Sequence, residues 1–333
     1  MTIYRRNTLL DTVRGAALCG IVFINAAYYS SVKPLGDVAG SVESLFSHAW
    51  SIVFGGKFFT LFSFLFGTGL QIFLTRSQQR NERYFLRYMR RASALYVLGA
   101  LHSLVWPSDI IVGYVTISFL IMWLFLVPLH YLQGVLAALL VASVCAVFLP
   151  VGSGILAFLT GIAYKLLPFA AGMYVARING FEWLAKQISG LAKYQLIAGV
   201  SVVFFVMGYG VLVVLGATSA RMDAYIRFTG YPMAACYFFI LAWVHGNCRF
   251  YWLSASLAVL GRMSLTHYLT QDTLGRWLID TTPLAPLRSY CIPIVALVIL
   301  GVQLGLGSLW LRYFRAGPFE WLVSRVTYGV VKG

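Results

Sequence analysis

Charged side chains are scarce in this sequence. Only 11% of its 333 residues are charged and 10 are acidic, whereas 60% are hydrophobic. The mean hydropathy is +0.81. A soluble domain averages about 25% charged and 45–50% apolar residues. We therefore exclude a soluble fold and predict an all-α, polytopic integral membrane protein.

Several common signatures are also missing. The five cysteines include no CxxC pair, so their spacing predicts neither a zinc site nor a disulfide framework. There is no Gly-x-Ser-x-Gly, His-Glu-x-x-His or Walker sequence. No Pro- or Ser-rich linker and no internal repeat is visible. We therefore expect a single helical-bundle domain over residues 1–333, and no metal.

Long apolar runs fill most of the chain. A membrane-spanning helix needs about 20 apolar residues. On that measure we count about ten spans, near residues 9–30, 49–74, 91–106, 109–127, 131–149, 153–176, 193–216, 226–246, 252–275 and 290–311. A last segment, Gly317 to Gly329, is too polar to span, and we expect it to lie on the membrane surface.

The basic residues distinguish the two sides of the membrane. Of the 25 Lys and Arg, 16 fall on the side that holds both termini, against five on the other side and four within spans. Cytoplasmic loops carry the excess of Lys and Arg, so both termini are predicted to be cytoplasmic. The net charge of +15 then reflects topology, and we expect no nucleic-acid partner.

A dense basic run lies between the second and third predicted spans. It contains six arginines between Arg76 and Arg91. The simpler interpretation is a cytoplasmic topology signal. The sharper alternative is a site for an anionic lipid or an anionic cofactor, since basic clusters beside a membrane attract anionic headgroups.

The first span carries two charged residues in an otherwise apolar helix. Asp11 and Arg14 are three residues apart, so they share a helical face and can partly neutralise each other. Ionised groups inside a spanning helix are candidates for function by default. We therefore treat the segment from Thr8 to Asn25 as the helix around which other polar clusters pack.

Five ordered motifs together resemble the YeiB-like bacterial inner-membrane proteins, whose C-terminal half is a domain of unknown function. The motifs are Leu10–Gly15, Lys57–Gly67, Leu98–His102 followed by Asp109, Leu260–Leu269, and Trp310–Trp321. The resemblance covers nearly the whole chain, with residues 153–329 as its YeiB-like C-terminal portion. It implies a multi-pass protein of the bacterial inner membrane.

The chain departs from that family's pattern in three places. His267 stands where relatives usually have Asn, and Asp272 stands where Ser or Thr is commoner. The segment from Pro150 to Lys165 is short where relatives carry a long extracytoplasmic loop. A substrate site built by that loop would be altered here.

The helix with Asp11 and Arg14 is also similar to the start of heparan-alpha-glucosaminide N-acetyltransferase and other transmembrane acyltransferases. This remote resemblance concerns the N-terminal helices, residues 1–127. It implies transfer of an acyl group from cytoplasmic acyl-CoA to an acceptor, often a sugar, across the membrane. The donor substrate would then be acyl-CoA, and the partners would be membrane lipids and a small-molecule or glycan acceptor.

The candidate donor-binding residues lie toward the predicted cytoplasmic side. Arg14 and Arg262 are suited to the phosphates of a nucleotide-bearing donor, because Arg pairs well with phosphate. The alternative is structural: Arg14 is neutralised by Asp11 or Glu320, and Arg262 bonds to backbone carbonyls. Asp11, Lys57, Glu320 and Arg325 are assigned as structural or helix-locking polar residues.

The candidate catalytic residues lie toward the predicted outer side. His102 ends the third span and Asp109 begins the fourth after a tight turn, so we expect them to be close. A His suits proton transfer near neutral pH, and a carboxylate can orient it. His267, oriented by Asp272, is the second candidate. The alternative is that His102 and Asp109 cap helix ends, and that His48, His130 and His245 are interfacial.

Three functions are compatible with this sequence. The first is an acyltransferase that uses His102 as general base. The second is a small-solute transporter whose pathway the same charges line, although no internal repeat is visible. The third is a non-catalytic membrane assembly or sensor protein, in which charge substitutions would lower abundance without affecting any flux.

Overall fold

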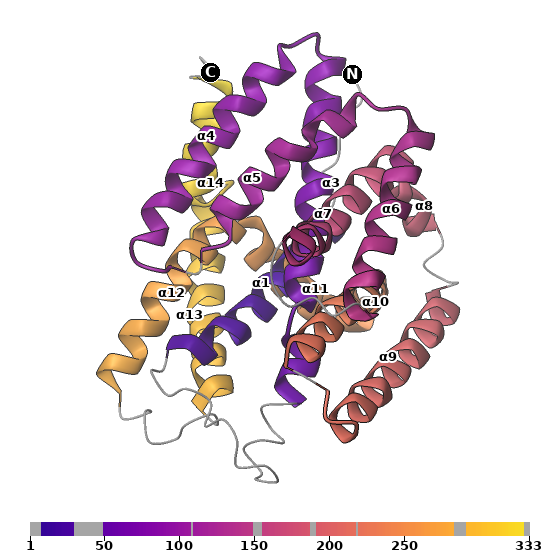
Figure 1. Ribbon diagram of the computed structural model, residues 1–333. Helices are drawn as coiled ribbons and strands as arrows, with labels where there is room; N and C mark the ends of the chain where they lie inside the picture. Colours follow the sequence, from indigo (N-terminus) through magenta and orange to yellow (C-terminus); the bar gives the residue numbers. More distant parts are fainter. Residues whose placement is uncertain are drawn as a thin grey trace. The chain divides into compact units, whose positions relative to one another are not determined.

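The computed structural model describes residues 8–29, 49–107, 109–148, 155–186, 191–217, 219–282 and 291–329 (Figure 1). Every regular element within these ranges is a helix, which confirms the all-α prediction. Among the described residues, four segments are long and apolar enough to cross a membrane: Thr8–Ala26, Ala49–Gln79, Gln195–Val214 and Ile292–Tyr313. The chain is therefore a helical membrane protein, while the count of ten spans and the side of the termini stay predictions.

The described helices belong to two compact units. The first unit comprises Met1–Phe58 and Phe238–Leu322. Its helices are α1 (Thr8–Tyr29), the end of α10 (Ser219–Gly246), the 3-10 turn η3 (Cys248–Phe250), α11 (Tyr251–Arg262), α12 (Ser264–Thr281), α13 (Cys291–Tyr313) and the start of α14 (Pro318–Tyr328).

Helix α1 is the centre of the first unit. It packs most extensively against α11 and also against α12 and α13. Val13, Ala17, Leu18 and Val22 are completely buried along it. Apolar residues on all sides are typical of a helix surrounded by other helices. The predicted central role of this segment is confirmed within its unit.

The second unit comprises Phe59–Tyr237 and Val323–Gly333. It contains most of α3 (Lys57–Gln79) and the first part of α10. Between them lie α4 (Tyr84–Ser103), α5 (Ile111–Ile121), the 3-10 turn η1 (Met122–Phe125), α6 (Leu129–Phe148), α7 (Ile155–Arg177), α8 (Gly180–Lys186) and α9 (Leu191–Val214).

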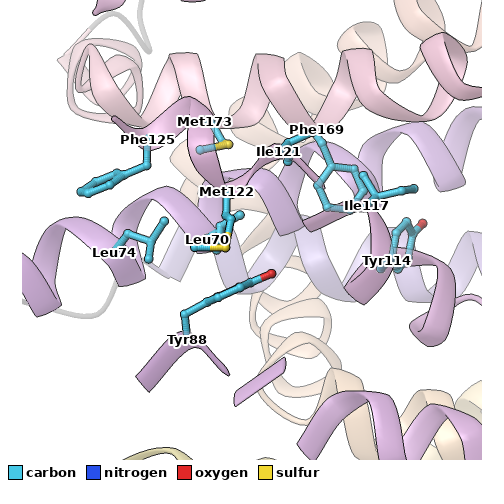
Figure 2. Close-up of a cluster of buried hydrophobic side chains, with 10 residues drawn as sticks. All are labelled: Leu70, Leu74, Tyr88, Tyr114, Ile117, Ile121, Met122, Phe125, Phe169 and Met173. Atoms are coloured by element: carbon cyan, nitrogen blue, oxygen red, sulfur yellow. The ribbon is translucent and has the colours of Figure 1, made fainter. Parts of the chain in front are cut away.

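The core of the second unit is a cluster of ten buried side chains from α3, α4, α5, η1 and α7 (Figure 2). Leu74 and Phe125 lie at one end of this cluster, and Tyr114 and Ile117 lie at the other. The Phe-rich face of α3 stacks on the ring of Tyr114. This packing gives Phe59, Phe62 and Phe66 a place in the core of the unit.

A close helix contact in this unit involves two glycines. A Cβ atom on Gly67 of α3 would stand 2.0 Å from the carbonyl oxygen of Phe169, and one on Gly172 of α7 would stand 2.0 Å from that of Phe64. Small residues allow helix backbones to approach closely in membrane proteins. Gly67 and Gly172 therefore allow α3 and α7 to pack closely.

Two helix boundaries differ from the prediction. Helix α4 begins at Tyr84, so Arg87, Arg90 and Arg91, predicted to lie in a loop, are on a helix. The predicted ninth span, 252–275, is not one continuous helix, because α11 ends at Arg262 and α12 begins at Ser264. The predicted surface segment forms helix α14, and its position on the membrane stays a prediction.

Candidate functional site

His102 and Asp109 form a buried pair in the second unit. Nδ1 of His102 lies 2.8 Å from Oδ1 of Asp109, and their side chains are only 5% and 1% exposed. The short connection from α4 to α5 brings them together. Within this connection, the main-chain carbonyl of His102 accepts hydrogen bonds from the backbone N–H groups of Val105 and Trp106. The predicted proximity of these two residues is confirmed.

Asp109 has a second role at the start of α5. Its Oδ2 accepts a hydrogen bond from the backbone N–H of Val112 at 3.1 Å. One carboxylate oxygen therefore caps the helix while the other faces the imidazole. A carboxylate on Nδ1 selects the tautomer whose Nε2 carries the lone pair. The arrangement is compatible with both the capping and the general-base interpretations.

Arg14 and Arg262 flank one helix crossing in the first unit. Each of them adjoins a glycine, and these glycines, Gly15 and Gly261, meet where α1 crosses α11. A Cβ on Gly15 would stand 1.9 Å from the carbonyl oxygen of Leu257, so no larger residue fits without movement. The motifs Leu10–Gly15 and Leu260–Leu269, separate in sequence, thus form one structural feature.

The two arginines at this crossing have different partners. Nη1 of Arg14 lies 3.4 Å from Oδ1 of Asp11, which confirms the predicted pairing within α1. Asp11 is buried, whereas the Arg14 side chain is 32% exposed. Nη2 of Arg262 donates to the carbonyl of Arg315 at 3.3 Å, as the structural interpretation expects. Its Nε is buried and has no hydrogen-bond partner in the described part of the chain.

Glu320 closes the break between α11 and α12. Its Oε1 accepts from the backbone N–H groups of Leu265 (2.7 Å) and Thr266 (3.2 Å), and its Oε2 accepts from the Thr266 hydroxyl (2.6 Å). The first N–H groups of a helix have no partner inside it, and a carboxylate there is favoured by the helix dipole. Glu320 is therefore a helix-locking residue, as predicted, but its partner is α12 and not Arg14.

His267 is buried on α12 and is not oriented by Asp272. Asp272 instead accepts hydrogen bonds from Asn25 and Tyr29 of α1. Nε2 of His267 faces Gly307, where a Cβ would stand 2.9 Å away, and it has no hydrogen-bond partner in the described ranges. The predicted His267–Asp272 pair is therefore wrong. A continuous helix places these residues on one broad face, but the neighbouring helices α1 and α13 divide that face between them.

The remaining candidates lie apart from these contacts. Lys57 is buried just after Gly56, whose φ of +75° interrupts the helix, and its Nζ is 3.4 Å from the carbonyl of Ser51. Arg325 is exposed on α14 in the second unit. The ring of His130 lies against Tyr131. His48 lies outside the described residues.

One polar cluster escaped the sequence reasoning. Nδ1 of His245 lies 2.8 Å from the Ser254 hydroxyl and 3.2 Å from the Thr12 hydroxyl, and Nε2 lies 3.2 Å from that of Thr8. His245 was predicted to be interfacial. The only sequence pattern that points to this cluster is the spacing of Thr8 and Thr12, which are four residues apart. That pattern is weak, because hydroxyls in apolar helices often bond only to their own backbone.

The chain is similar to a family of unknown function and to uncharacterized bacterial proteins. Residues 176–330 match the family described as "Protein of unknown function (DUF418)". The uncharacterized protein YxaH of Bacillus subtilis (strain 168) is 26% identical over 96% of this chain and 94% of its own length. The uncharacterized protein YeiB of Escherichia coli (strain K12) is 25% identical over 97% and 96%. No solved structure matches the chain.

These matches support a YeiB-like family for the chain, so the resemblance seen in the five motifs is confirmed. The class is a helical membrane protein whose residues 176–330 are similar to the DUF418 family. The curated relatives are themselves described as uncharacterized. Their names therefore indicate no activity for this chain, and function has to be inferred from the residues of the site.

Proposed function

We propose that the chain is a membrane-embedded acyltransferase that moves an acyl group from cytoplasmic acyl-CoA to an extracytoplasmic hydroxyl or amine. The observation that carries this proposal is the buried His102–Asp109 pair, with its 2.8 Å contact. A general base needs a correctly oriented lone pair, and an imidazole held by a carboxylate provides one. The multi-pass arrangement in a bacterial inner membrane, with cytoplasmic termini, is part of the proposal.

In the proposed reaction, Nε2 of His102 takes the proton of the acceptor as the acceptor oxygen or nitrogen attacks the thioester carbonyl. The new ester or amide bond forms, the carbon–sulfur bond breaks, and the CoA thiolate leaves. The proton on His102 then neutralises that thiolate. Asp109 stabilises the imidazolium throughout, because its carboxylate stays on Nδ1.

Arg14 and Arg262 are proposed to hold the phosphates of the donor. Both guanidinium groups start from the same helix crossing, and planar guanidinium pairs well with phosphate oxygens. The Arg14 side chain is partly exposed, and Arg262 keeps a buried Nε–H without a partner in the described part of the chain. The unpartnered Nε–H of Arg262 is the donor that supports this assignment, and Arg14 is assigned by its position beside the same crossing.

Membrane vesicles that contain the protein test the proposal. We expect radioactive acetyl-CoA to label an acceptor, and we expect His102→Gln and Asp109→Asn to remove at least about 99% of that labelling, because a general base contributes 10²–10⁴-fold. The matched control is His130→Gln, an exposed histidine on α6. Full labelling by His102→Gln, at equal abundance, would contradict the base assignment.

Donor binding is tested separately with purified protein. CoA should raise the midpoint of thermal unfolding, and Arg14→Gln and Arg262→Gln should abolish that rise. Arg249→Gln is the control, because Arg249 is exposed on η3. A rise of equal size in all three variants would exclude Arg14 and Arg262 from the donor site.

The broken helix favours a second candidate function, a small-solute transporter. Discontinuous helices form the substrate sites of many secondary transporters, and α11 and α12 are separated at a single residue, Met263. This function predicts uptake or efflux that responds to a proton gradient or membrane potential and needs no CoA. Such a flux, together with absent acyl labelling, would replace the acyltransferase proposal.

A further inference from the structure

The second unit contains an apolar pocket of about 250 Å³ near the start of α4. Its floor is formed by Leu74, Met122 and Phe125, which are buried members of the core cluster (Figure 2). Its rim is formed by Phe85, Trp123 and Leu126. The lining offers almost no polar surface, so the part of a ligand that enters it must be apolar.

The rim is open to the surroundings of the unit. Phe85, Trp123 and Leu126 are 44%, 53% and 56% exposed. In a membrane protein, large apolar side chains with this exposure face lipid, because contact with hydrocarbon avoids the unfavourable free energy of contact with water. The pocket is therefore accessible from the side at which lipid tails lie.

Two exposed arginines shortly precede pocket residues in the chain. The turn from α3 to α4 is fixed by a left-handed Asn81 (φ +52°) and by a backbone hydrogen bond from Glu82 to Ser77. Arg80 and Arg83 lie on this turn, directly before the pocket residues Tyr84 and Phe85, and both are exposed. They are suited to an anionic group held just outside the apolar pocket.

Two other arginines of this run are engaged within the unit. Arg87 pairs with Glu82, and its guanidinium lies 5.2 Å from the ring centre of Tyr328. The guanidinium of Arg91 lies 5.6 Å from that of Phe73. Arg80 and Arg83, by contrast, make no side-chain hydrogen bond or ion pair among the described residues. The excess positive charge at the turn is therefore available to an outside partner.

We propose that this pocket takes an acyl chain of an anionic phospholipid whose headgroup phosphate is bound by Arg80 and Arg83. An apolar pocket next to unengaged cations matches an amphiphile with an apolar tail and an anionic head. Anionic lipids supply both parts at the membrane surface, and basic residues on the cytoplasmic side attract them. The distribution of Lys and Arg predicts that this turn is cytoplasmic. The site is independent of the acyl-transfer reaction proposed above.

Lipid retention by the purified protein tests this site. The protein is extracted in mild detergent, mixed with phosphatidylglycerol or phosphatidylcholine, and examined by native mass spectrometry. We expect retention of phosphatidylglycerol, and roughly tenfold weaker retention in the double variant R80Q/R83Q. The matched control is R312Q/R315Q, which removes two exposed arginines with the same spacing at the end of α13.

A variant that fills the pocket tests whether the acyl chain of the lipid binds there. Leu126→Trp should weaken retention of phosphatidylglycerol, whereas Leu120→Trp should not, because Leu120 is equally exposed on α5 but does not line the pocket. Glycerophosphoglycerol, which has the headgroup alone, should fail to compete.

Three results would overturn the proposal: equal retention of the two lipids, unchanged retention in R80Q/R83Q, or full competition by the headgroup. Binding of palmitoyl-CoA in place of phosphatidylglycerol would likewise overturn it, by assigning the pocket to a different ligand.

Discussion

Gly15 of α1 and Gly261 of α11 lie backbone against backbone. A Cβ on Gly261 would stand 1.8 Å from the carbonyl oxygen of Asp11 and 2.8 Å from the nitrogen of Gly15. The crossing holds α1 against α11, and it fixes where Arg14 and Arg262 leave their helices. Packing and the proposed donor site therefore depend on the same two glycines.

Alanine at either glycine should destabilise the protein. Gly15→Ala and Gly261→Ala each force two helix backbones apart, and overpacking of this kind costs about 1–3 kcal/mol. We expect a lower midpoint of thermal unfolding in detergent. Gly301→Ala on α13 is the control, since a Cβ there meets no atom within 4 Å. Equal midpoints for all three variants would show that the crossing is looser than described.

Removal of the Glu320 carboxylate should weaken the start of α12. Glu320→Ala removes the acceptor of two backbone N–H groups, and loss of such a cap costs about 1–2 kcal/mol. Glu320→Gln keeps one acceptor oxygen and should lose less. The measurement is again thermal unfolding, with the exposed Glu182→Ala on α8 as control. If Glu320→Ala unfolds at the same temperature as Glu182→Ala, the cap has no role in stability.

The contact between His102 and Asp109 should appear as an interaction energy. In a double-mutant cycle with His102→Ala and Asp109→Ala, we expect coupling of about 0.5–3 kcal/mol, as for other contacting pairs. Asp109→Asn should destabilise less than Asp109→Ala, since its amide oxygen can still accept from Val112. Additive effects on the free energy of unfolding would indicate that the pair is not formed.

The bond from Tyr29 to Asp272 should stabilise the contact between α1 and α12. Tyr29→Phe removes the hydroxyl that donates to the buried carboxylate, and we expect a loss of about 1–3 kcal/mol. Tyr313→Phe is the control, because Tyr313 is 78% exposed. Should the two variants unfold at one temperature, the hydroxyl contributes nothing measurable.

The pattern of apolar residues predicted much of this fold because burial follows from local composition. The all-helical architecture and the proximity of His102 and Asp109 both follow from residues near one another in the chain. Only seven positions separate His102 from Asp109, so a tight turn was enough to predict their contact.

The features that the sequence did not predict depend on distant residues. The apolar run across Met263 reads as one helix, and it is divided in two because Glu320 provides acceptors for a second helix start. Likewise, Asp272 is bound by Asn25 and Tyr29, more than 240 residues away. Helical spacing within one segment cannot show which neighbouring helix each side chain meets.

The break at Met263 also has a consequence for biosynthesis. The backbone N–H groups of Leu265 and Thr266, at the start of α12, donate to the carboxylate of Glu320, which lies 55 positions after Leu265. This cap can therefore form only after α13 and the start of α14 have been synthesised. The start of α12 thus gains its cap later than its neighbours along the chain gain their helical hydrogen bonds.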